Sequence, residues 1–339
     1  MLFRNTYGVD LGTSTIKIYS LRRNKAYIEK NTIAIKDEQK PLAVGDDAYE
    51  MFEKAPKNIY VHSPMAFGMI ANAKHMSIAL YRFLKKIDWS LGVRPTLYFA
   101  IPTDLSQIEK RAYYSIVNMA PFRSNKVYVI EKPIADALAM EIPIESTMGS
   151  MIVNIGAQTS EMSVIADGKI IISKRVPIGG NQLNEEIIRE VRNRYNLQIG
   201  TRTARRLKFT LASFKSNHKD ARKAIGIGSL SGLPREEIIS SLAVNRAIER
   251  PMSQIASEIK TFLERTPPQI AYHIYQEGIY LSGGSTRTQD IEKYLQRATG
   301  YPFHLSAMHE TCTIVGVTKV IRNKKYKKWA VPVSQKKDY

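Results

Sequence analysis

The chain has 339 residues, 44% of them hydrophobic, which is enough to bury one large core or two moderate ones, and we expect two domains. Its single cysteine, Cys312, excludes a disulfide framework and a cysteine-based zinc site, and no long apolar run predicts a membrane span or secretory signal, so we expect a cytoplasmic protein. The net charge of +19 favours an acidic partner such as anionic lipid or a nucleotide, and the absence of nucleic-acid-binding motifs argues against specific nucleic-acid binding.

The first predicted element is a β-hairpin at residues 7–20. An apolar strand that carries Asp10 is followed by a turn and a second, alternating strand. Glycine lets the backbone approach an anion closely, hydroxyl and amide groups donate hydrogen bonds, and Asp10 can orient a water on a divalent cation. The hairpin is therefore a candidate phosphate loop, with an ordinary solvated turn as the alternative. The turn consists of Gly12, Thr13, Ser14 and Thr15.

Strands and helices alternate over residues 97–140. Two apolar runs, 97–101 and 127–130, predict buried strands, and a predicted helix follows each of them. This alternation predicts an α/β layout with sites at the carboxyl ends of the strands, where Glu131 and Lys132 lie. The first of the two helices is expected to bury Leu105, Ile108, Ala112, Ile116 and Met119.

A second hairpin at residues 151–164 repeats the pattern of the first. Asn154 stands where the first hairpin has Asp10, and Gly156 stands where it has Gly12. The repeat suggests an internal duplication whose two phosphate loops face each other across a cleft. The alternative is a coincidence between two hairpins.

The rest of the chain predicts helices at residues 181–195, 201–214 and 252–263, then a strand at 278–281. The strand leads through a glycine pair into a helix at residues 288–298. Such a pair between strand and helix lets a flat ring or a phosphate lie on bare backbone.

Three segments, 8–15, 154–161 and 281–286, resemble the first phosphate loop, second phosphate loop and adenosine loop of the actin-like ATPases. Further runs, including Leu197–Ala204 and Leu263–Pro268, are similar to bacterial MreB, the rod-shape actin homologue, and the resemblance covers about residues 7–322. It implies an α/β actin-like fold, with two lobes of duplicated ribonuclease H-like domains flanking a nucleotide cleft. The implied divisions are lobe I at 1–143, to which 312–322 can return, lobe II at 144–311, and a basic, disordered tail at 323–339.

The resemblance also implies binding of ATP or ADP with Mg²⁺. Asp10 would hold the metal through water. Arg205 to Lys208 occupy the family's ribose- and base-contacting helix, but the family usually has an acid at the position of Arg205, which puts the contact of Arg205 in doubt. The residues implied in nucleotide contacts are Asp10, Gly12, Thr13, Ser14, Thr15, Asn154, Gly156, Ala157, Gln158, Thr159, Arg205, Lys208, Gly283, Gly284, Ser285 and Thr286.

Two departures from the family pattern concern hydrolysis. MreB proteins usually carry, at the position of Lys132, a glutamate that helps to position the attacking water, and a charged lysine cannot accept a proton. The second phosphate loop has Asn154, Ala157 and Gln158 in place of an acid and two glycines. We therefore expect retained ATP binding with slow hydrolysis at a degenerate site of Glu131, Lys132 and Thr159; the alternative is that Glu131 replaces the missing base.

Two segments are candidates for contact with an anionic membrane surface. A short apolar loop at 87–93 carries Trp89 and Leu91, which either insert into lipid or pack on their own lobe. The second segment is the tail, which is either a lipid-binding or a solubilising segment. Its candidate residues are Lys324, Lys325, Lys327, Lys328 and Trp329.

The function implied by the resemblance is a membrane-associated cytoskeletal filament at the inner face of the cell membrane that helps to set cell shape. Its partners would be copies of itself in paired protofilaments, and the membrane. One alternative is a non-hydrolysing structural paralogue that co-assembles with active MreB-type relatives in cell helicity or motility. A small-molecule kinase of the same superfamily is disfavoured, because the chain has no additional acid suited to act as a base toward an acceptor.

Overall fold

The computed structural model describes residues 5–37, 39–89, 95–121, 126–215 and 219–333. The chain divides into two units, residues 1–144 with 311–339, and residues 145–310. These boundaries fall one residue from those expected for the two lobes.

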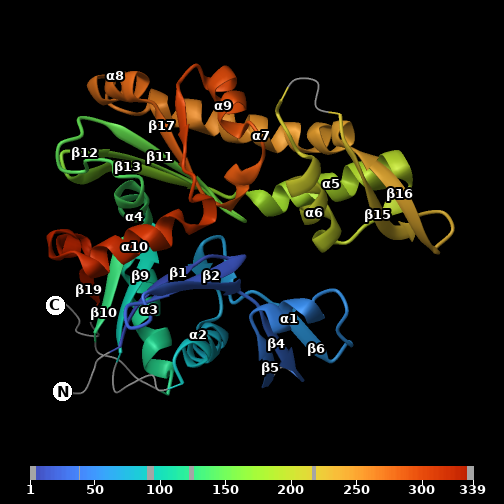
Figure 1. The fold of residues 1–339 in the computed structure, drawn as a ribbon, viewed down its shortest axis with the longest axis horizontal. Helices are drawn as coiled ribbons and strands as arrows, with labels where there is room; N and C mark the ends of the chain where they lie inside the picture. Colours follow the sequence, from blue (N-terminus) through green and yellow to red (C-terminus); the bar gives the residue numbers. More distant parts are fainter. Residues whose placement is uncertain (1–4, 38, 90–94, 122–125, 216–218, 334–339) are drawn as a thin grey trace. The chain divides into compact units, whose positions relative to one another are not determined.

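The centre of the first unit is a six-stranded sheet with the strand order β19-β10-β9-β1-β2-β3 (Figure 1). The strands β1, β2 and β3 form an antiparallel meander, β9 pairs parallel with β1, and β10 pairs parallel with β9. The strands are β1 (Thr6–Leu11), β2 (Thr15–Ser20), β3 (Lys25–Lys30), β9 (Thr96–Ile101), β10 (Val127–Glu131) and β19 (Val331–Val333).

Alternation along β1 decides which helices cover each face of this sheet. Tyr7, Val9 and Leu11 are buried in one core with side chains of α2 (Ala73–Ile87) and α3 (Gln107–Met119). On the other face a Cβ atom at Gly8 would lie 2.7 Å from Val317 of α10 (Cys312–Arg322). The helix α10 packs in turn on α4 (Lys132–Ala139), which begins directly after β10.

A smaller sheet with the order β5-β4-β6 completes the first unit, together with one short helix and a two-stranded ribbon. These elements are β4 (Ile33–Lys36), β5 (Lys40–Val44), α1 (Asp46–Met51), β6 (Ile59–His62), β7 (Met65–Ala66) and β8 (Met69–Ile70).

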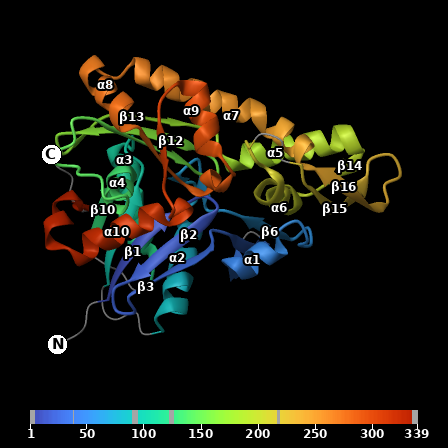
Figure 2. The same cartoon turned by 45° about the horizontal axis from the view of Figure 1, so that its top comes forward.

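The second unit repeats the topology of the first. Its main sheet has the order β13-β12-β11-β17-β18, in which an antiparallel meander is again followed by two parallel pairings. Two strands of this sheet, β12 and β13, are labelled in Figure 2. This shared topology agrees with the internal duplication inferred from the two hairpins. The strands are β11 (Ser150–Ile155), β12 (Ser160–Ala166), β13 (Lys169–Val176), β17 (Ile279–Ser282) and β18 (Phe303–Leu305).

Helices and a three-stranded sheet, β14-β15-β16, surround the main sheet of the second unit. The helix α7 begins at Ser241 and continues through Pro251. The predicted helix at 252–263 therefore covers only its second half. The elements are α5 (Gly180–Tyr195), β14 (Leu197–Gln198), α6 (Thr201–Leu211), β15 (Ala221–Gly228), β16 (Pro234–Ser240), α7 (Ser241–Glu264), α8 (Pro268–Glu277), η1 (Gly284–Arg287), α9 (Ile291–Thr299) and η2 (His309–Thr311).

The prediction of which residues α3 buries is wrong in part. Ile116 is buried as predicted, but Ile108 and Met119 are 80% and 60% exposed. The helix packs instead through Tyr113, Ile116 and Val117, which are three and four residues apart and so lie on one face.

The expectation of a disordered tail also differs from the structure. Residues 324–329 form a 3-10 helix, η3 (Lys324–Trp329), whose first turn is capped by the side chain of Asn323. The strand β19 then pairs antiparallel with β10, Val127 opposite Val333. Backbone pairing on an open sheet edge can order a segment of this kind whatever its charge. Residues 334–339 lie outside the described part of the chain.

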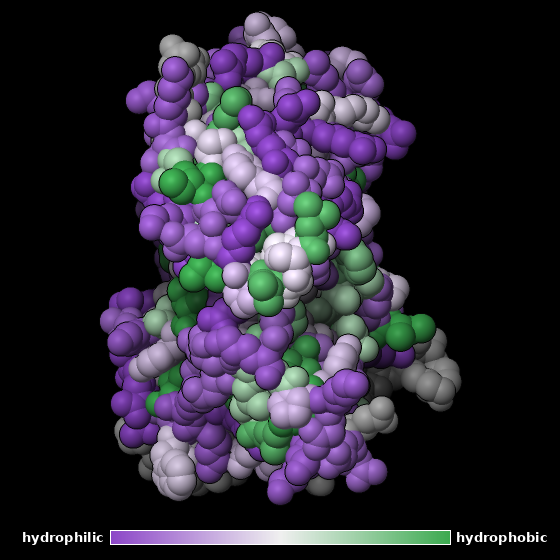
Figure 3. All heavy atoms as spheres, turned by 90° about the vertical axis from the view of Figure 1, so that its right-hand side faces the viewer, coloured by the Kyte–Doolittle hydropathy of each residue, from purple (hydrophilic) through white to green (hydrophobic). Residues whose placement is uncertain are grey.

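Exposed hydrophobic side chains are spread over the described surface. Figure 3 shows one side of the molecule, on which hydrophobic residues form small groups among hydrophilic ones. In the hairpin β15–β16, Ile225, Ile227 and Ile238 are 65%, 44% and 61% exposed, while Ala224 and Ile239 are buried. The outer face of the hairpin therefore carries three exposed isoleucines beside the ion pair of Lys223 and Glu236.

The packing of α10 on α4 predicts a sensitive glycine. A Cβ atom at Gly316 would overlap the backbone carbonyl group of Ala135. We expect Gly316→Ala to lower the free energy of unfolding by about 1–3 kcal/mol, measured by urea denaturation, because backbone cannot move aside as a side chain can. The matched control is Gly284→Ala, whose added methyl group would lie 3.5 Å from Glu310, an ordinary contact. Equal stability of the two variants would contradict the close packing.

Candidate functional site

The first hairpin turn is held by donors from outside the turn. Gly12 N donates to Thr15 O at 3.1 Å and closes the turn. The side chain of Asn31 donates to Gly12 O at 2.8 Å, and its backbone N–H donates to Ser14 O at 3.1 Å. Ser63 Oγ donates to Thr13 O at 2.9 Å. The carbonyl groups of three consecutive turn residues are therefore bound within the protein, which removes acceptors that would repel an anion.

A buried carboxylate lies beside this turn, between two lysines. Asp10 is 3% exposed, and its Oδ2 accepts a hydrogen bond from Lys17 Nζ at 2.8 Å. Its Oδ1 has no hydrogen-bond partner, but Lys132 Nζ lies 3.7 Å away. Burial raises the pKa of Asp10, but the charges of Lys17 and Lys132 outweigh burial and hold that pKa below its usual value. Asp10 is therefore ionised, with the ammonium group of one lysine bonded to it and that of a second lysine nearby.

Lys132 reaches Asp10 because α4 begins at this residue, directly after β10 ends. Its side chain is 12% exposed. The preceding residue, Glu131, is the N-cap of α4, and burial raises its pKa although the charge of Lys110 lowers it. The expected degenerate site thus has a cation, Lys132, close to Asp10, and a partly buried acid, Glu131, directly before Lys132 in the chain.

The second hairpin turn is held in the same way by different residues. Gly156 N donates to Thr159 O at 2.8 Å. Gly156 O accepts two hydrogen bonds, from Gly180 N at 2.9 Å and from Ser285 Oγ at 2.8 Å. Asn181 N donates to Ala157 O at 2.7 Å. The turn, the start of α5 and the segment 283–286 therefore meet at Gly156.

The segment 283–286 depends on a glycine at its start. Gly283 has a φ of +95°, and a Cβ atom there would lie 2.7 Å from Asn154 Oδ1, so only glycine fits. Thr286 Oγ1 donates to Gly283 O at 2.7 Å and lies 3.0 Å from His309 Nδ1. Asn154, the counterpart of Asp10, therefore packs against the predicted adenosine loop rather than against a cation pair.

Lys208 is a buried cation in this second group. It is 3% exposed, and its Nζ donates to Gly180 O at 2.7 Å. Burial, helped by the charge of Arg205, lowers the pKa of Lys208 to about 7. Arg205, Lys208 and Arg287 lie 5.6, 5.0 and 5.3 Å from the centre of the Phe209 ring. Arg205 and Lys208 of α6 and Arg287 of η1 therefore gather around one aromatic ring next to the predicted adenosine loop.

The predicted nucleotide residues thus form two groups, one in each unit. Sequence reasoning missed the residues that hold the turns, above all Lys17, Asn31, Ser63 and Gly180. A lysine between two isoleucines at 16–18 was a usable indication, because its register places it opposite Asp10 on the neighbouring strand. Asn31 and Ser63 lie in connections between strands, and nothing in their local sequence points to the turn.

Of the candidate membrane residues that the structure describes, Trp89 and the lysines of η3 are exposed and Trp329 is half-buried. Trp89 is 85% exposed, and its ring centre lies 5.2 Å from Lys85 Nζ of its own unit. Asp88, next to it, is buried and accepts hydrogen bonds from Tyr7 Oη at 2.9 Å and Arg23 Nε at 3.0 Å. Leu91 lies outside the described residues. The four lysines of η3 are exposed, and Lys328 Nζ lies 4.5 Å from the centre of the Trp329 ring.

The described residues contain no group of three or more His, Cys, Asp or Glu side chains arranged to hold a metal ion. Within the same residues, no helix has the length and apolar character needed to span a bilayer.

Comparison with known proteins finds the same family by sequence and by structure. The MreB/Mbl protein family model matches residues 4–328. The cell shape-determining protein MreB of Escherichia coli (strain K12) is 30% identical over 328 residues, covering 94% of each chain. The crystal structure of MreB5 of Spiroplasma citri bound to ADP has a TM-score of 0.89, at 26% identity, and covers 97% of this chain and 99% of that one. The AMPPNP-bound form of MreB5 has a TM-score of 0.88, at 27% identity, covering 96% and 97%.

The burial of Lys208 predicts a specific pH dependence of stability. Its pKa falls from an ordinary 10.5 to about 7 in the folded protein, so between these values the unfolded chain binds more protons and stability rises with pH. We expect Lys208→Met to stabilise the protein at pH 7 by on the order of 3 kcal/mol, and the gain to shrink toward pH 10. Urea denaturation across this range measures it, with the exposed Lys260→Met as control. Parallel pH curves for wild type and Lys208→Met would contradict the assignment.

Proposed function

We propose that this chain, which belongs to the MreB/Mbl family, binds an adenine nucleotide, assembles into filaments and helps to determine cell shape. The fold is the actin-like α/β fold expected from the sequence. The relatives that support the proposal include a cell shape-determining protein and an MreB5 solved with ADP and with AMPPNP. The three exposed isoleucines of the hairpin β15–β16, Ile225, Ile227 and Ile238, offer surface for contacts between copies.

The residues present fit a nucleoside polyphosphate. Both turns have their carbonyl groups bound internally, and a Cβ atom at Gly12 would lie 2.8 Å from Thr15 O, so the turn is compact. Lys17 and Lys132 bring two positive charges to one carboxylate, which leaves an excess of positive charge for phosphate. Lys208 and the backbone at Gly283 would hold the adenosine part, as the family resemblance implies.

The fit to Mg²⁺ is through a single carboxylate. Asp10 Oδ1 is a buried oxygen without a hydrogen-bond partner, so it can accept a hydrogen bond from a water of a hydrated cation. Mg²⁺ bound to a nucleotide takes most of its ligands from phosphates and water, and it neutralises phosphate charge. Within this chain Asp10 would orient it, while Lys17 keeps Asp10 ionised.

The contact between Lys132 and Asp10 is the observation that carries the proposal of slow hydrolysis. Hydrolysis requires a group that orients the attacking water and accepts its proton. Lys132 lies 3.7 Å from Asp10 as a cation, and while charged it cannot accept a proton from water. Glu131 is the alternative base, since its raised pKa would suit proton transfer.

The same contact favours a second candidate function, a structural paralogue that does not hydrolyse ATP and co-assembles with active MreB-type relatives. In that case the nucleotide fixes the conformation of the protein rather than timing its assembly. Electron microscopy with ATP, ADP and a non-hydrolysable analogue on a lipid monolayer separates the two. Filaments that form alike with all three support the structural role.

We also propose that the protein works peripherally at the inner face of the cell membrane. The cations of η3 and the exposed Trp89 support this, because basic and interfacial aromatic residues favour anionic lipid surfaces.

Restoring the family's acid should raise hydrolysis. We expect Lys132→Glu to increase phosphate release from ATP by about 10- to 100-fold, because a carboxylate at this position can orient and deprotonate water. The control for charge is Lys126→Glu, at an exposed lysine before β10. Glu131→Gln should leave the wild-type rate unchanged. A wild type that already releases phosphate as fast as ordinary family members would contradict the proposal.

The lysines of η3 should govern binding to anionic vesicles. Truncation is unsuitable because it removes β19 from the edge of β10, so the test replaces Lys324, Lys325, Lys327 and Lys328 by Gln. At about 1 kcal/mol per lysine near the surface, each is worth roughly fivefold in sedimentation with anionic vesicles. A matched variant loses the same charge at exposed lysines elsewhere, Lys25, Lys40, Lys57 and Lys260. Equal loss by both variants would show a general charge effect and remove η3 from the account.

A further inference from the structure

Two histidines of the first unit lie directly against each other. His62 is the last residue of β6, and His75 lies in the first turn of α2. His62 Nε2 and His75 Nδ1 are 3.0 Å apart, which is a hydrogen-bond distance. The ring of His62 also stacks on Tyr60, with the ring centres 4.6 Å apart. The histidine pair therefore joins the end of β6 to the start of α2.

The segment between these two elements begins with a residue that holds the first phosphate turn. Ser63 directly follows β6, and its Oγ donates to Thr13 O at 2.9 Å. The segment 63–72 ends at Asn72, the N-cap of α2, whose side chain accepts a hydrogen bond from His75 N at 2.9 Å. The contact between the two imidazole rings thus closes the segment that carries Ser63.

The proton between the two rings can be assigned from the far side of His62. His62 Nδ1 is buried, and within the described part of the chain it has no hydrogen-bond partner. Protein interiors tolerate an unpaired acceptor better than an unpaired N–H group. We therefore assign the proton to His62 Nε2, which donates to His75 Nδ1.

The pair cannot take up a further proton and keep its hydrogen bond. A third proton leaves one bare nitrogen on the two rings. If the bare nitrogen is one of the two that face each other, His62 Nδ1 must carry a buried N–H group without an acceptor. If it is one of the other two, two N–H groups point at each other across 3.0 Å. In agreement, burial lowers the pKa of both histidines, helped by the charge of His75 at His62 and of Lys74 at His75.

The acids of the helices near the pair are engaged elsewhere. Strand β4, which pairs with β6, places Ile33 opposite His62, and β7 and β8 contain only apolar residues. The acids are Asp46, which accepts from Lys30 N, Asp47, 3.7 Å from Lys86, and Glu50, 3.8 Å from Lys54, in α1, and Glu109, which accepts from Ser106 N, in α3. A protonated ring therefore gains little from neighbouring carboxylates.

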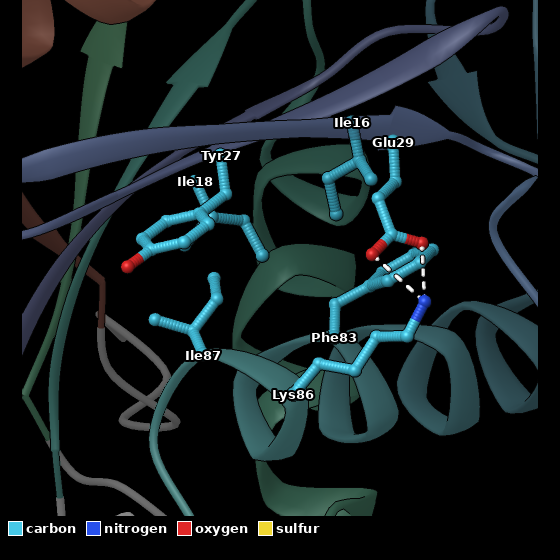
Figure 4. Close-up of a pocket in the computed structure, with 7 residues that line it drawn as sticks. All are labelled: Ile16, Ile18, Tyr27, Glu29, Phe83, Lys86 and Ile87. Atoms are coloured by element: carbon cyan, nitrogen blue, oxygen red, sulfur yellow. Dashed lines mark hydrogen bonds and ion pairs between the residues drawn. The ribbon is translucent and has the colours of Figure 1, made fainter.

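The far end of α2 is held independently of the histidines. Lys86 Nζ donates to both carboxylate oxygens of Glu29 on β3, at 2.9 and 3.0 Å (Figure 4). A small apolar cavity of about 210 Å³ lies beside this ion pair, between β2, β3 and α2. Its hydrophobic lining includes Ile16, Ile18 and Phe83. Loss of the histidine contact would therefore free the segment 63–72 and leave the helix in place.

We propose that His62 and His75 form a proton-sensitive latch that positions Ser63 on the first phosphate turn. While both rings are neutral the latch is closed, and Ser63 binds Thr13 O. Acidification protonates a ring and breaks the contact between the rings, so the segment 63–72 releases the turn and nucleotide binding weakens. The inference rests on the proposed nucleotide function of this turn. Both histidines are positioning residues, because they act through Ser63.

The direction of the pH effect distinguishes the latch from a simple charge effect. Because the closed latch lowers the pKa of both histidines, the open form binds more protons, and the closed form loses stability as the pH falls through the ordinary histidine pKa of 6.5. The charge of a protonated ring would by itself attract phosphate and strengthen nucleotide binding. Only the latch makes binding weaker in acid.

The test compares wild type with a variant that keeps the hydrogen bond and removes the titration. In His62→Gln with His75→Asn, the amide groups replace Nε2 as donor and Nδ1 as acceptor. Between about pH 7.5 and about pH 5, we expect wild type to lose affinity for the fluorescent nucleotide methylanthraniloyl-ADP about fivefold or more relative to this double variant. The ratio is measured because Lys208 and the nucleotide phosphate also titrate in this range. A ratio that is constant with pH, or a relative gain by wild type, would overturn the latch.

Further variants locate the effect. Ser63→Ala removes the link to the turn, so it should bind nucleotide more weakly and lose the additional pH dependence; a pH dependence equal to that of wild type would contradict the role of Ser63. The matched control is His304→Gln, at an exposed histidine of β18 in the second unit, which should keep the wild-type response. If the double variant does not fold, His75→Asn alone should still have a smaller pH dependence than wild type.

Hydrogen exchange separates the latch from nucleotide binding. In the protein without nucleotide, we expect the amides of residues 63–72 to lose protection on acidification in wild type but not in the double variant, after correction for intrinsic exchange rates. If this occurs but no nucleotide binds at any pH, the latch stands and the proposed nucleotide function fails. If nucleotide binds with the same pH dependence in both proteins, the latch is wrong and nucleotide binding stands.

Discussion

The first unit depends on one buried carboxylate and the two ammonium groups around it. Asp10 on β1, Lys17 on β2 and Lys132 at the start of α4 tie a strand pair to the helix that follows β10. One negative and two positive charges leave an excess positive charge in a buried place, and such a charge is costly without a counter-ion. The arrangement is therefore suited to receive phosphate. The same lysine occupies the position at which the family resemblance implies a glutamate.

Both units solve the same backbone problem at their turns. A tight turn has carbonyl groups that must be bound if the turn is to face an anion. In the first unit Asn31 and Ser63 bind them, and in the second Gly180, Asn181 and Ser285 do so. The duplication is thus plain in strand order and turn geometry, whereas the residues that support each turn have no counterpart in the other unit.

Strands and turns were predictable from the sequence because their patterns are local. Both hairpins, the strands at 97–101 and 127–130, and the glycine at 283 were found in this way. Contacts between distant segments were not predictable, since nothing near Ser63 or Asn31 indicates the turn that they hold. The tail was misjudged for the same reason. Charge composition favoured disorder, but the open edge of β10 lies about 200 residues earlier in the chain, and it pairs with Val331–Val333.

The two faces of β2 serve different chemistry. Alternation turns Lys17 toward Asp10, while Ile16 and Ile18 line the apolar cavity. Any displacement of this strand therefore moves the side chains on both of its faces. Thermodynamic linkage then requires reciprocity: the free energy by which an occupant of one face alters affinity at the other is the same in both directions. Whatever strengthens binding on one face of this six-residue strand would strengthen binding on the other face by the same free energy.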